Sequence, residues 1–502
     1  MDANKALTEK IRLWLRKPAN FYLLAILIFA FILRLYYFLL TQDQALWWDE
    51  AEYMAYAKKI VFGTPYDISP KRVVLFPFLI SLIFRVGLSE QSVRFFLVLV
   101  PSVLVVFFTY LLAKEMYSEK IALLTAFLTA VLWIHLFYSA RVMNDEMSFL
   151  FGLLAFYFFW KGYAFGKNNK FVYISGFFIA LSFLLRPAGI YYGVIIAIFV
   201  LITENFKFLK KPALWGMVLV FLLTLSPHLI WSYYHHGDAL AFTGAYGGPG
   251  EENFGWDAFK FIPLYTEKVF LAFFFMGLIT FITIILGFDQ ILKGSKKYQN
   301  DLFIAISMIF LLGINIFVLR SFEERWFMAM SFAIFIITSK GIMLTFQLIK
   351  KYIKELGAIT IIIIIIFSGA YIQLKHADQI IKLKVNTYAE IRAAGLWIKD
   401  NSNPQDSVWS RSLPQLAYYS ERRVFRENSS VLDVAEQELL NQLNEEKPKY
   451  FVLYVFENHA PWMFEFPAKY PEVFVPVQVY TLNNQPILVI YKISYNNLQE
   501  TA

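Results

Sequence analysis

The chain has 502 residues, of which 58% are hydrophobic, 19% aromatic and only 17% charged. Soluble globular proteins carry about 25% charged residues, so this composition excludes an ordinary soluble protein and indicates a polytopic membrane protein. The net charge of +8 does not indicate nucleic-acid binding, because membrane proteins concentrate Lys and Arg in their cytoplasmic loops. The chain has no cysteine, which excludes disulfides, thiolate nucleophiles and cysteine metal ligands.

The N-terminal part of the chain predicts a membrane anchor. Residues 21–40 are almost continuously apolar, and at about 1.5 Å per residue they are long enough to cross a bilayer. Basic residues precede this stretch, and no small-residue cleavage site follows it. We therefore expect a retained first span and a cytoplasmic N-terminus.

The sequence WWDEAEY follows the first span at once and places Asp49, Glu50 and Glu52 beside two tryptophans. A carboxylate at the edge of the hydrocarbon core is costly to desolvate, so it either caps a helix or takes part in function. Asp49 and Glu52 have the spacing of a helix capping box. Capping and catalysis are compatible, because backbone donors hold a capping carboxylate rigidly.

Twelve apolar segments have the pattern of membrane helices, and we expect eleven of them to cross the membrane. The exception is residues 73–88, in which the stretch 73–87 would be about 22 Å long as a helix against a hydrocarbon core of about 30 Å. Only if this segment stays on the outer side do the later Lys-rich connectors all lie in the cytoplasm, which also makes the C-terminus external. The expected spans are residues 21–40, 95–113, 121–138, 146–160, 171–185, 190–203, 213–234, 263–287, 302–319, 326–345 and 356–373.

This topology gathers acidic pairs and arginines at the external membrane surface. The acids either cap helices or bind and deprotonate substrate hydroxyls. The arginines either reach out to lipid headgroups or clamp a phosphate through the fork of the guanidinium group. The residues concerned are Asp49, Glu50, Arg72, Arg141, Asp145, Glu146, Arg186, Glu324 and Arg325.

The sequence changes character after residue 374 and predicts a soluble α/β domain. Residues 378–401 and 432–446 have helical patterns, and the turn LNNQP predicts a hairpin between the last two strands. The four strand-like runs are residues 406–410, 449–456, 473–480 and 486–493. We therefore expect an α-helical polytopic membrane protein with a transmembrane domain over 1–374 and an extracytoplasmic α/β domain over 375–502.

Several stretches, in this order, resemble the C-type glycosyltransferases, the GT-C superfold. DEAEYMAYAKKI is similar to the first external loop of that family, and the region from SPKRVVLFPF to MNDEMSF resembles its juxtamembrane helix, its arginine-headed span and its second acidic motif. FEERWFMAM is similar to a late Glu-x-Arg-aromatic element, and AAGLWIKDNSNPQDSVWS resembles the external tail of bacterial and archaeal members. The resemblance covers nearly the whole chain. It is closest to the branch of protein O-mannosyltransferases and lipid A aminoarabinose transferases.

The resemblance implies a glycosyltransferase of the cell envelope that is integral to the plasma membrane and has its active site and C-terminal domain outside the cytoplasm. Such an enzyme transfers one sugar, with inversion, from a polyprenyl-phosphate donor to a lipid, glycan or protein acceptor. Asp49 is then expected to be the general base, and the catalytic Glu50 beside it would help to orient acceptor and donor hydroxyl groups. Asp145 and Glu146 would orient hydroxyl groups of the acceptor and donor.

The resemblance also implies a site for the leaving phosphate at the outer headgroup level. Arg141 and Arg325 would neutralise the phosphate, with Arg72 and Glu324 as further substrate contacts. A lipid-linked donor agrees with a sequence that lacks a nucleotide-phosphate loop.

We expect no cofactor and no essential metal ion. His235, His236 and Asp238 could in principle bind a divalent ion, but histidine pairs in loops seldom bind metal. Two rival classes are a transporter or flippase of a lipid-linked or small solute, and a scaffolding membrane protein whose acids are only caps. Transporters place ionisable residues near the bilayer midplane. Here the spans are nearly free of charge apart from Arg34, and the acids lie at one edge.

Overall fold

The computed structural model describes residues 16–245 apart from 165 and 167, residues 298–319, 323–426 and 436–496, and residues 9, 13 and 14. The chain forms two compact units. The first comprises Met1–Thr41, Pro70–Leu75 and Arg94–Leu383, and the second comprises Gln42–Ser69, Phe76–Val93 and Lys384–Ala502. The expected boundary between residues 374 and 375 lies within one helix and stays a prediction.

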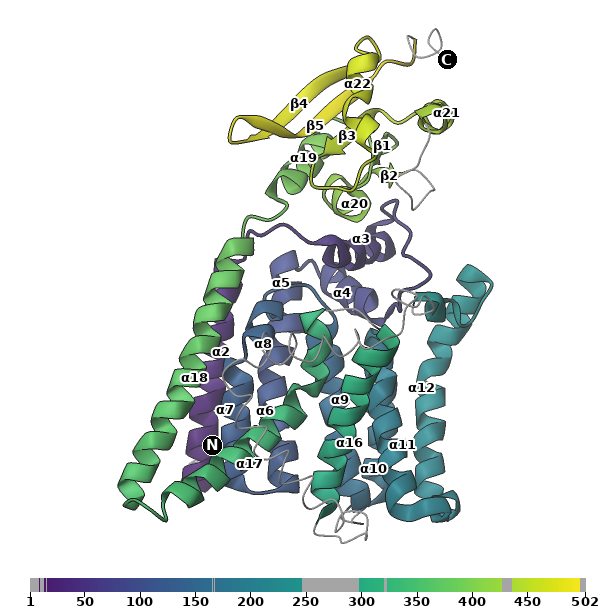
Figure 1. Ribbon diagram of the computed structural model, residues 1–502. Helices are drawn as coiled ribbons and strands as arrows, with labels where there is room; N and C mark the ends of the chain where they lie inside the picture. Colours follow the sequence, from purple (N-terminus) through teal and green to yellow (C-terminus); the bar gives the residue numbers. More distant parts are fainter. Residues whose placement is uncertain are drawn as a thin grey trace. The chain divides into compact units, whose positions relative to one another are not determined.

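The first unit is a bundle of helices that stand side by side (Figure 1). Its elements are α2 (Pro18–Leu40), η1 (Phe95–Leu99), α6 (Val100–Met116), α7 (Glu119–Val131), α8 (Trp133–Tyr138), α9 (Asp145–Phe159), η2 (Trp160–Ala164), α10 (Asn169–Leu185), η3 (Pro187–Gly189), α11 (Ile190–Glu204), η4 (Asn205–Lys210), α12 (Pro212–His236), η5 (Ala241–Ala245), α16 (Gln299–Gly313), η8 (Ile314–Leu319), η9 (Glu324–Met330), α17 (Ser331–Ile349) and α18 (Glu355–Lys384).

Small residues allow close approach of helices in this bundle. Helix α10 packs against both α9 and α12. A Cβ atom at Gly176 of α10 would lie 2.2 Å from the carbonyl oxygen of Met217 in α12. Glycine at such a contact lets two backbones touch, which is the usual way to gain packing energy between membrane helices.

Seven helical segments among the described residues are long and apolar enough to cross a membrane. They are Pro18–Leu40, Glu90–Met116, Pro187–Lys210, Pro212–His236, Gln299–Leu319, Glu324–Ile349 and Glu355–Asp400. Three other expected spans form shorter helices, and the one over 121–138 is divided because Leu132 is extended between α7 and α8. The expected span 263–287 lies outside the described residues. A polytopic helical fold is confirmed, and the number of eleven spans stays a prediction.

The segment expected not to cross forms the short helix α4 (Leu75–Arg85). Its 11 residues make a helix of about 16 Å, roughly half the thickness of the hydrocarbon core. From Phe76 onward this helix belongs to the second unit, where Phe76 contacts Tyr53 with ring centroids 5.3 Å apart. Its placement on the outer side of the membrane stays a prediction.

The second unit combines the segments that follow α2 with the C-terminal part of the chain. Its elements are α3 (Trp48–Phe62), α4, α5 (Glu90–Arg94), α19 (Ala389–Asp400), β1 (Ser407–Ser410), α20 (Leu413–Ser420), β2 (Arg423–Phe425), α21 (Glu436–Glu446), β3 (Tyr450–Tyr454), η10 (Pro461–Phe464), α22 (Phe466–Lys469), β4 (Phe474–Leu482) and β5 (Gln485–Ile493). One sheet has the strand order β2-β1-β3-β5-β4, in which the first three strands are parallel and the last three antiparallel.

All four expected strands are present, and the hairpin predicted from LNNQP is confirmed. Asn483 and Asn484 connect β4 to β5 with φ angles of 51° and 63°. Two consecutive positive φ angles define the turn that matches the twist of a hairpin, and asparagine tolerates them better than most residues. The expected continuous helix over 378–401 is wrong, because α18 ends at Lys384 and α19 begins after Tyr388, whose φ is 65°.

Candidate functional site

The first acidic pair opens α3 in the second unit. Trp47 is the residue before the helix, and its backbone N–H donates to the Glu50 carboxylate at 3.3 Å. Glu50 is 1% exposed, whereas Asp49 is partly exposed in the first turn. The capping box expected from Asp49 and Glu52 is therefore wrong: it is formed two residues earlier, by Trp47 and Glu50. Glu50 has the reciprocal capping position, and Glu52 instead accepts from the backbone N–H of Ser69 at 3.4 Å.

The second acidic pair opens α9 in the first unit. Asp145 forms an ion pair with Arg186, which follows the C-terminus of α10. Asn144 precedes the helix, but its side chain does not cap it and donates to the backbone oxygen of Leu185 at 2.5 Å. The loop before α9 is thus held against the end of α10 by two contacts. They fix the position of the Asp145 carboxylate.

Glu146 lies in a fully buried chain of polar contacts. Its Oε1 atom is 2.8 Å from Nδ1 of His135, and Nε2 of His135 is 3.1 Å from the hydroxyl of Ser331. The Ser331 hydroxyl donates its proton to the backbone oxygen of Met328 at 2.8 Å, so it accepts a proton from Nε2 of His135. One further proton must then lie between Nδ1 and Glu146, because two lone pairs cannot face each other at 2.8 Å.

This count makes the pair of His135 and Glu146 neutral overall. Either an imidazolium faces a carboxylate, or a neutral imidazole accepts from a carboxylic acid. Both side chains are 1% exposed or less. The sequence carries no specific signal for His135, which stands in an apolar stretch. The available hint is that a buried imidazole needs polar partners.

The two expected phosphate-binding arginines of the first unit share a neighbour. The Arg141 guanidinium lies 4.7 Å from the ring centroid of Phe137 and is almost fully buried. Nε of Arg325 is 2.5 Å from a carboxylate oxygen of Glu323. Both arginines and the partly exposed Glu324 act electrostatically on Tyr138, so these groups lie in one region.

The remaining charged candidates have distinct settings. Arg72 is partly exposed in the turn that leads to α4. Arg34, the arginine noted within the expected spans, donates to the Ser102 hydroxyl at 2.7 Å and to the backbone oxygen of Ala130 at 3.2 Å. Its contacts tie α2 to α6 and α7. Within the part of the chain that the structure describes, no three His, Asp or Glu side chains are grouped as metal ligands.

Comparison with known proteins supplies the family context. A family model described as dolichyl-phosphate-mannose-protein mannosyltransferase matches residues 71–231. No curated protein gives a significant match to the chain.

Solved structures with similar folds cover nearly the whole chain. ArnT from Cupriavidus metallidurans in the apo state is 11% identical, with a TM-score of 0.68, over 94% of this chain and 98% of that chain. The same protein bound to undecaprenyl phosphate is 11% identical, with a TM-score of 0.66, over 92% and 97% of the two chains. The chain has the GT-C superfold. AglB, the oligosaccharyltransferase of Archaeoglobus fulgidus, in complex with an inhibitory peptide and a dolichol-phosphate, is 14% identical, with a TM-score of 0.63, over 96% and 75%.

The predicted resemblance to GT-C glycosyltransferases is thereby confirmed, and the chain is an integral membrane protein. The matched region 71–231 of this GT-C chain contains the contacts of Asp145 with Arg186 and of Glu146 with His135. Asp49 and Glu50 precede it.

Proposed function

We propose that this GT-C protein is a membrane glycosyltransferase that transfers one sugar from a polyprenyl-phosphate donor to an acceptor outside the cytoplasm, with inversion. The observation that carries the proposal is that two Asp-Glu pairs each open a helix, in a chain whose fold matches an ArnT structure bound to undecaprenyl phosphate. A lipid, a glycan or a protein serves as acceptor. The protein is integral to the plasma membrane, and its active site and soluble C-terminal domain face the extracytoplasmic side.

In this proposal Asp49 is the general base. It takes the proton from an acceptor hydroxyl as the oxygen attacks the anomeric carbon of the donor. The bond from that carbon to the phosphate oxygen breaks on the opposite face, so the anomeric centre inverts and polyprenyl phosphate leaves. The partial exposure of Asp49 fits contact with a substrate.

The buried glutamates have supporting roles. Glu50 accepts from the backbone at the start of α3 and so holds the turn that carries Asp49. Glu146 is fully enclosed with His135 and holds the turn that carries Asp145. Asp145 orients a sugar hydroxyl, and its ion pair with Arg186 holds the carboxylate in place.

The arginines stabilise the charge that develops on the leaving phosphate. Arg325 offers a guanidinium fork, and its contact with Glu323 holds the side chain in one orientation. Arg141 is held by its contact with the Phe137 ring. Arg72 and Glu324 are partly exposed and supply the outer substrate contacts.

The test is transfer of label from radiolabelled polyprenyl-phosphate sugars, presented to the purified protein in lipid vesicles together with extracted envelope lipids and glycans. Release of free polyprenyl phosphate coupled to a labelled product is the expected result. Asp49→Asn should lower the rate by about 10²–10⁴-fold. Asp43→Asn is the matched control, because Asp43 is an exposed aspartate six residues earlier. Uptake of label without product would instead indicate a transporter and refute the proposal.

A further inference from the structure

The C-terminal segment contacts α3 through the end of α20, where Glu421 adopts a backbone conformation that side chains seldom take. Its φ is 55°, in the left-handed region that usually favours glycine after a helix. Glutamate is less favourable than glycine in this backbone conformation. Contacts of the Glu421 side chain are therefore expected to compensate for that cost.

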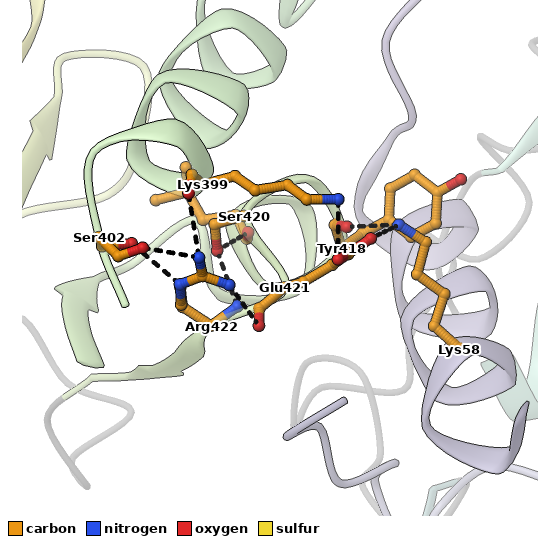
Figure 2. A network of polar contacts seen from close by, with 8 residues as sticks. Lys58, Lys399, Ser402, Tyr418, Ser420, Glu421 and Arg422 are labelled. Atoms are coloured by element: carbon orange, nitrogen blue, oxygen red, sulfur yellow. Dashed lines mark hydrogen bonds and ion pairs between the residues drawn. The ribbon is translucent and has the colours of Figure 1, made fainter. Parts of the chain in front are cut away.

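The Glu421 carboxylate joins two helices besides its own (Figure 2). One oxygen accepts from Nζ of Lys58 in α3 at 2.7 Å, and the other accepts from Nζ of Lys399 in α19 at 2.8 Å. Burial tends to raise the pKa of Glu421, but hydrogen bonds from Lys399 and Lys58 outweigh it and lower the pKa below its ordinary value. The carboxylate is thus ionised at neutral pH and binds both ammonium groups.

Lys58 makes two further contacts with the same turn of α20. Its ammonium group donates to the backbone oxygen of Tyr418 at 3.1 Å and lies 4.2 Å from the centroid of the Tyr418 ring. A flexible lysine that meets a carboxylate, a carbonyl and an aromatic face at once is held in one position. Lys58 is correspondingly well covered, with 17% of its side chain exposed.

The backbone that presents Glu421 is itself fixed by the next residue. Arg422 donates from Nε to the Ser402 hydroxyl at 2.9 Å, and from Nη2 to the backbone oxygens of Ser402 and Lys399 at 2.9 and 3.0 Å. Figure 2 shows these bonds converging on the end of α19. The backbone that carries the Glu421 carboxylate is therefore held rigidly.

A second pair of contacts joins α20 to the segment before α3 and to α5. The backbone N–H of Leu46 donates to the Tyr419 hydroxyl at 2.8 Å, and the Tyr418 hydroxyl donates to Glu90 of α5 at 3.0 Å. Asp49 comes three residues after Leu46 and nine residues before Lys58. The helix turn that carries Asp49 is thus bracketed by two attachments to α20.

We propose that α20, through Glu421 and Tyr419, is a positioning element that fixes α3 and with it the carboxylate of Asp49. The inference rests on the proposed function, in which Asp49 is the general base. Glu421 and Lys58 contact no reacting atom on this view and act through α3. Because misplacement by about 1 Å can cost about 10²-fold in rate, loosening of this attachment should lower turnover more than substrate binding.

The experiment compares Lys58→Met with Lys399→Met in the full-length protein. Both changes remove one ammonium group from the same carboxylate, but only Lys58 belongs to α3. Lys58→Met should lower kcat by about tenfold or more with little change in the KM for donor or acceptor, whereas Lys399→Met should stay within about threefold of wild type. Backbone hydrogen exchange over 48–62 should become faster in Lys58→Met alone. Lys58→Arg, which retains the charge, should restore most of the rate.

The outcomes separate this inference from the proposed function. A wild-type protein without transferase activity refutes the proposed function, whatever the exchange data show. An active wild type and an inactive Asp49→Asn, combined with a fully active Lys58→Met, refute the positioning role. A raised KM for the acceptor with unchanged kcat would assign Lys58 to acceptor binding instead. Equal losses in Lys58→Met and Lys399→Met, in proportion to lost thermal stability, would show a purely structural role.

Discussion

The neutral pair of His135 and Glu146 makes a sharp prediction about Glu146. If a shared proton fills the 2.8 Å gap between the two side chains, glutamine can replace glutamate, because its amide N–H donates to Nδ1 in place of that proton. The bond from Nε2 to Ser331 then stays unchanged. The cost is the difference between a charge-assisted and a neutral hydrogen bond, about 1 kcal/mol.

Alanine at the same position has a different effect. Glu146→Ala leaves Nδ1 of His135 buried without a partner and also removes packed side-chain atoms. Removal of one member of a buried pair costs about 3–5 kcal/mol. We therefore expect Glu146→Gln to unfold close to the wild-type temperature and Glu146→Ala to unfold at a clearly lower one, or to fail to accumulate.

The assay couples thermal unfolding in detergent to transfer kinetics in vesicles. As a positioning residue, Glu146 should tolerate glutamine with less than about a threefold loss of rate. A carboxylate that bound a sugar hydroxyl by its charge would contribute about 1.5–3 kcal/mol, so glutamine would cost about 10-fold to 150-fold. A stable Glu146→Gln protein with a loss of that size would refute the positioning role. A Glu146→Gln protein as unstable as Glu146→Ala would refute the proton count.

A matched pair of serines tests the contact between His135 and Ser331, at the other end of this chain of polar contacts. The Ser331 hydroxyl accepts from His135, whereas the equally buried Ser307 hydroxyl donates to the backbone oxygen of Phe303 in its own helix. Ser331→Ala should cost about 1–3 kcal/mol by leaving the imidazole N–H without a partner. Ser307→Ala should be nearly neutral. Equal stability of the two variants would argue against the chain of contacts.

Three further predictions concern other parts of the molecule. Arg325→Lys keeps the charge but loses the guanidinium fork, so donor KM should rise while the unfolding temperature stays constant; an unchanged KM would remove Arg325 from the donor site. Cysteines introduced at the exposed Ser89 and Lys120 should react with an impermeant thiol reagent from outside and from the cytoplasm respectively, and external labelling at both would disprove the proposed topology. Because the folded pKa of Glu421 lies below its ordinary 4.5, its stabilising contribution is present above that pH and is lost as the pH falls through the folded pKa. Acidification below about pH 4.5 should therefore lower the unfolding temperature more in wild type than in Glu421→Gln, and parallel curves would contradict this.

The features that the sequence could predict are those set by local pattern. Apolar runs predicted helices because a membrane span must satisfy its own backbone hydrogen bonds. LNNQP predicted a hairpin because two asparagines accept the positive φ angles of the turn. The short strand β2 (Arg423–Phe425) was missed, since three residues carry no alternation, and its parallel pairing with β1 depends on tertiary structure.

Long-range contacts were the part that pattern could not supply. The contact of His135 with Ser331 joins residues 196 positions apart, and that of Lys58 with Glu421 joins residues 363 apart. A charged residue on an amphipathic helix has many solvated alternatives, so nothing local selects its partner. The prediction that Asp49 and Glu52 form the capping box failed for a local reason. The helix begins at Trp48, and tryptophan is not a residue that marks a helix start.

The two Asp-Glu pairs share a feature of their geometry. Successive residues of a helix lie about 100° apart around its axis, so neighbouring acids in a first turn cannot face the same way. In both pairs the glutamate turns into the protein: Glu50 accepts from the backbone before α3, and Glu146 contacts His135. The aspartate lies on another side of the helix: Asp49 is partly exposed, whereas the buried Asp145 pairs with Arg186. In the proposed function each glutamate holds the turn on which its neighbouring aspartate stands, so replacement of either glutamate should act on the chemistry only through that aspartate.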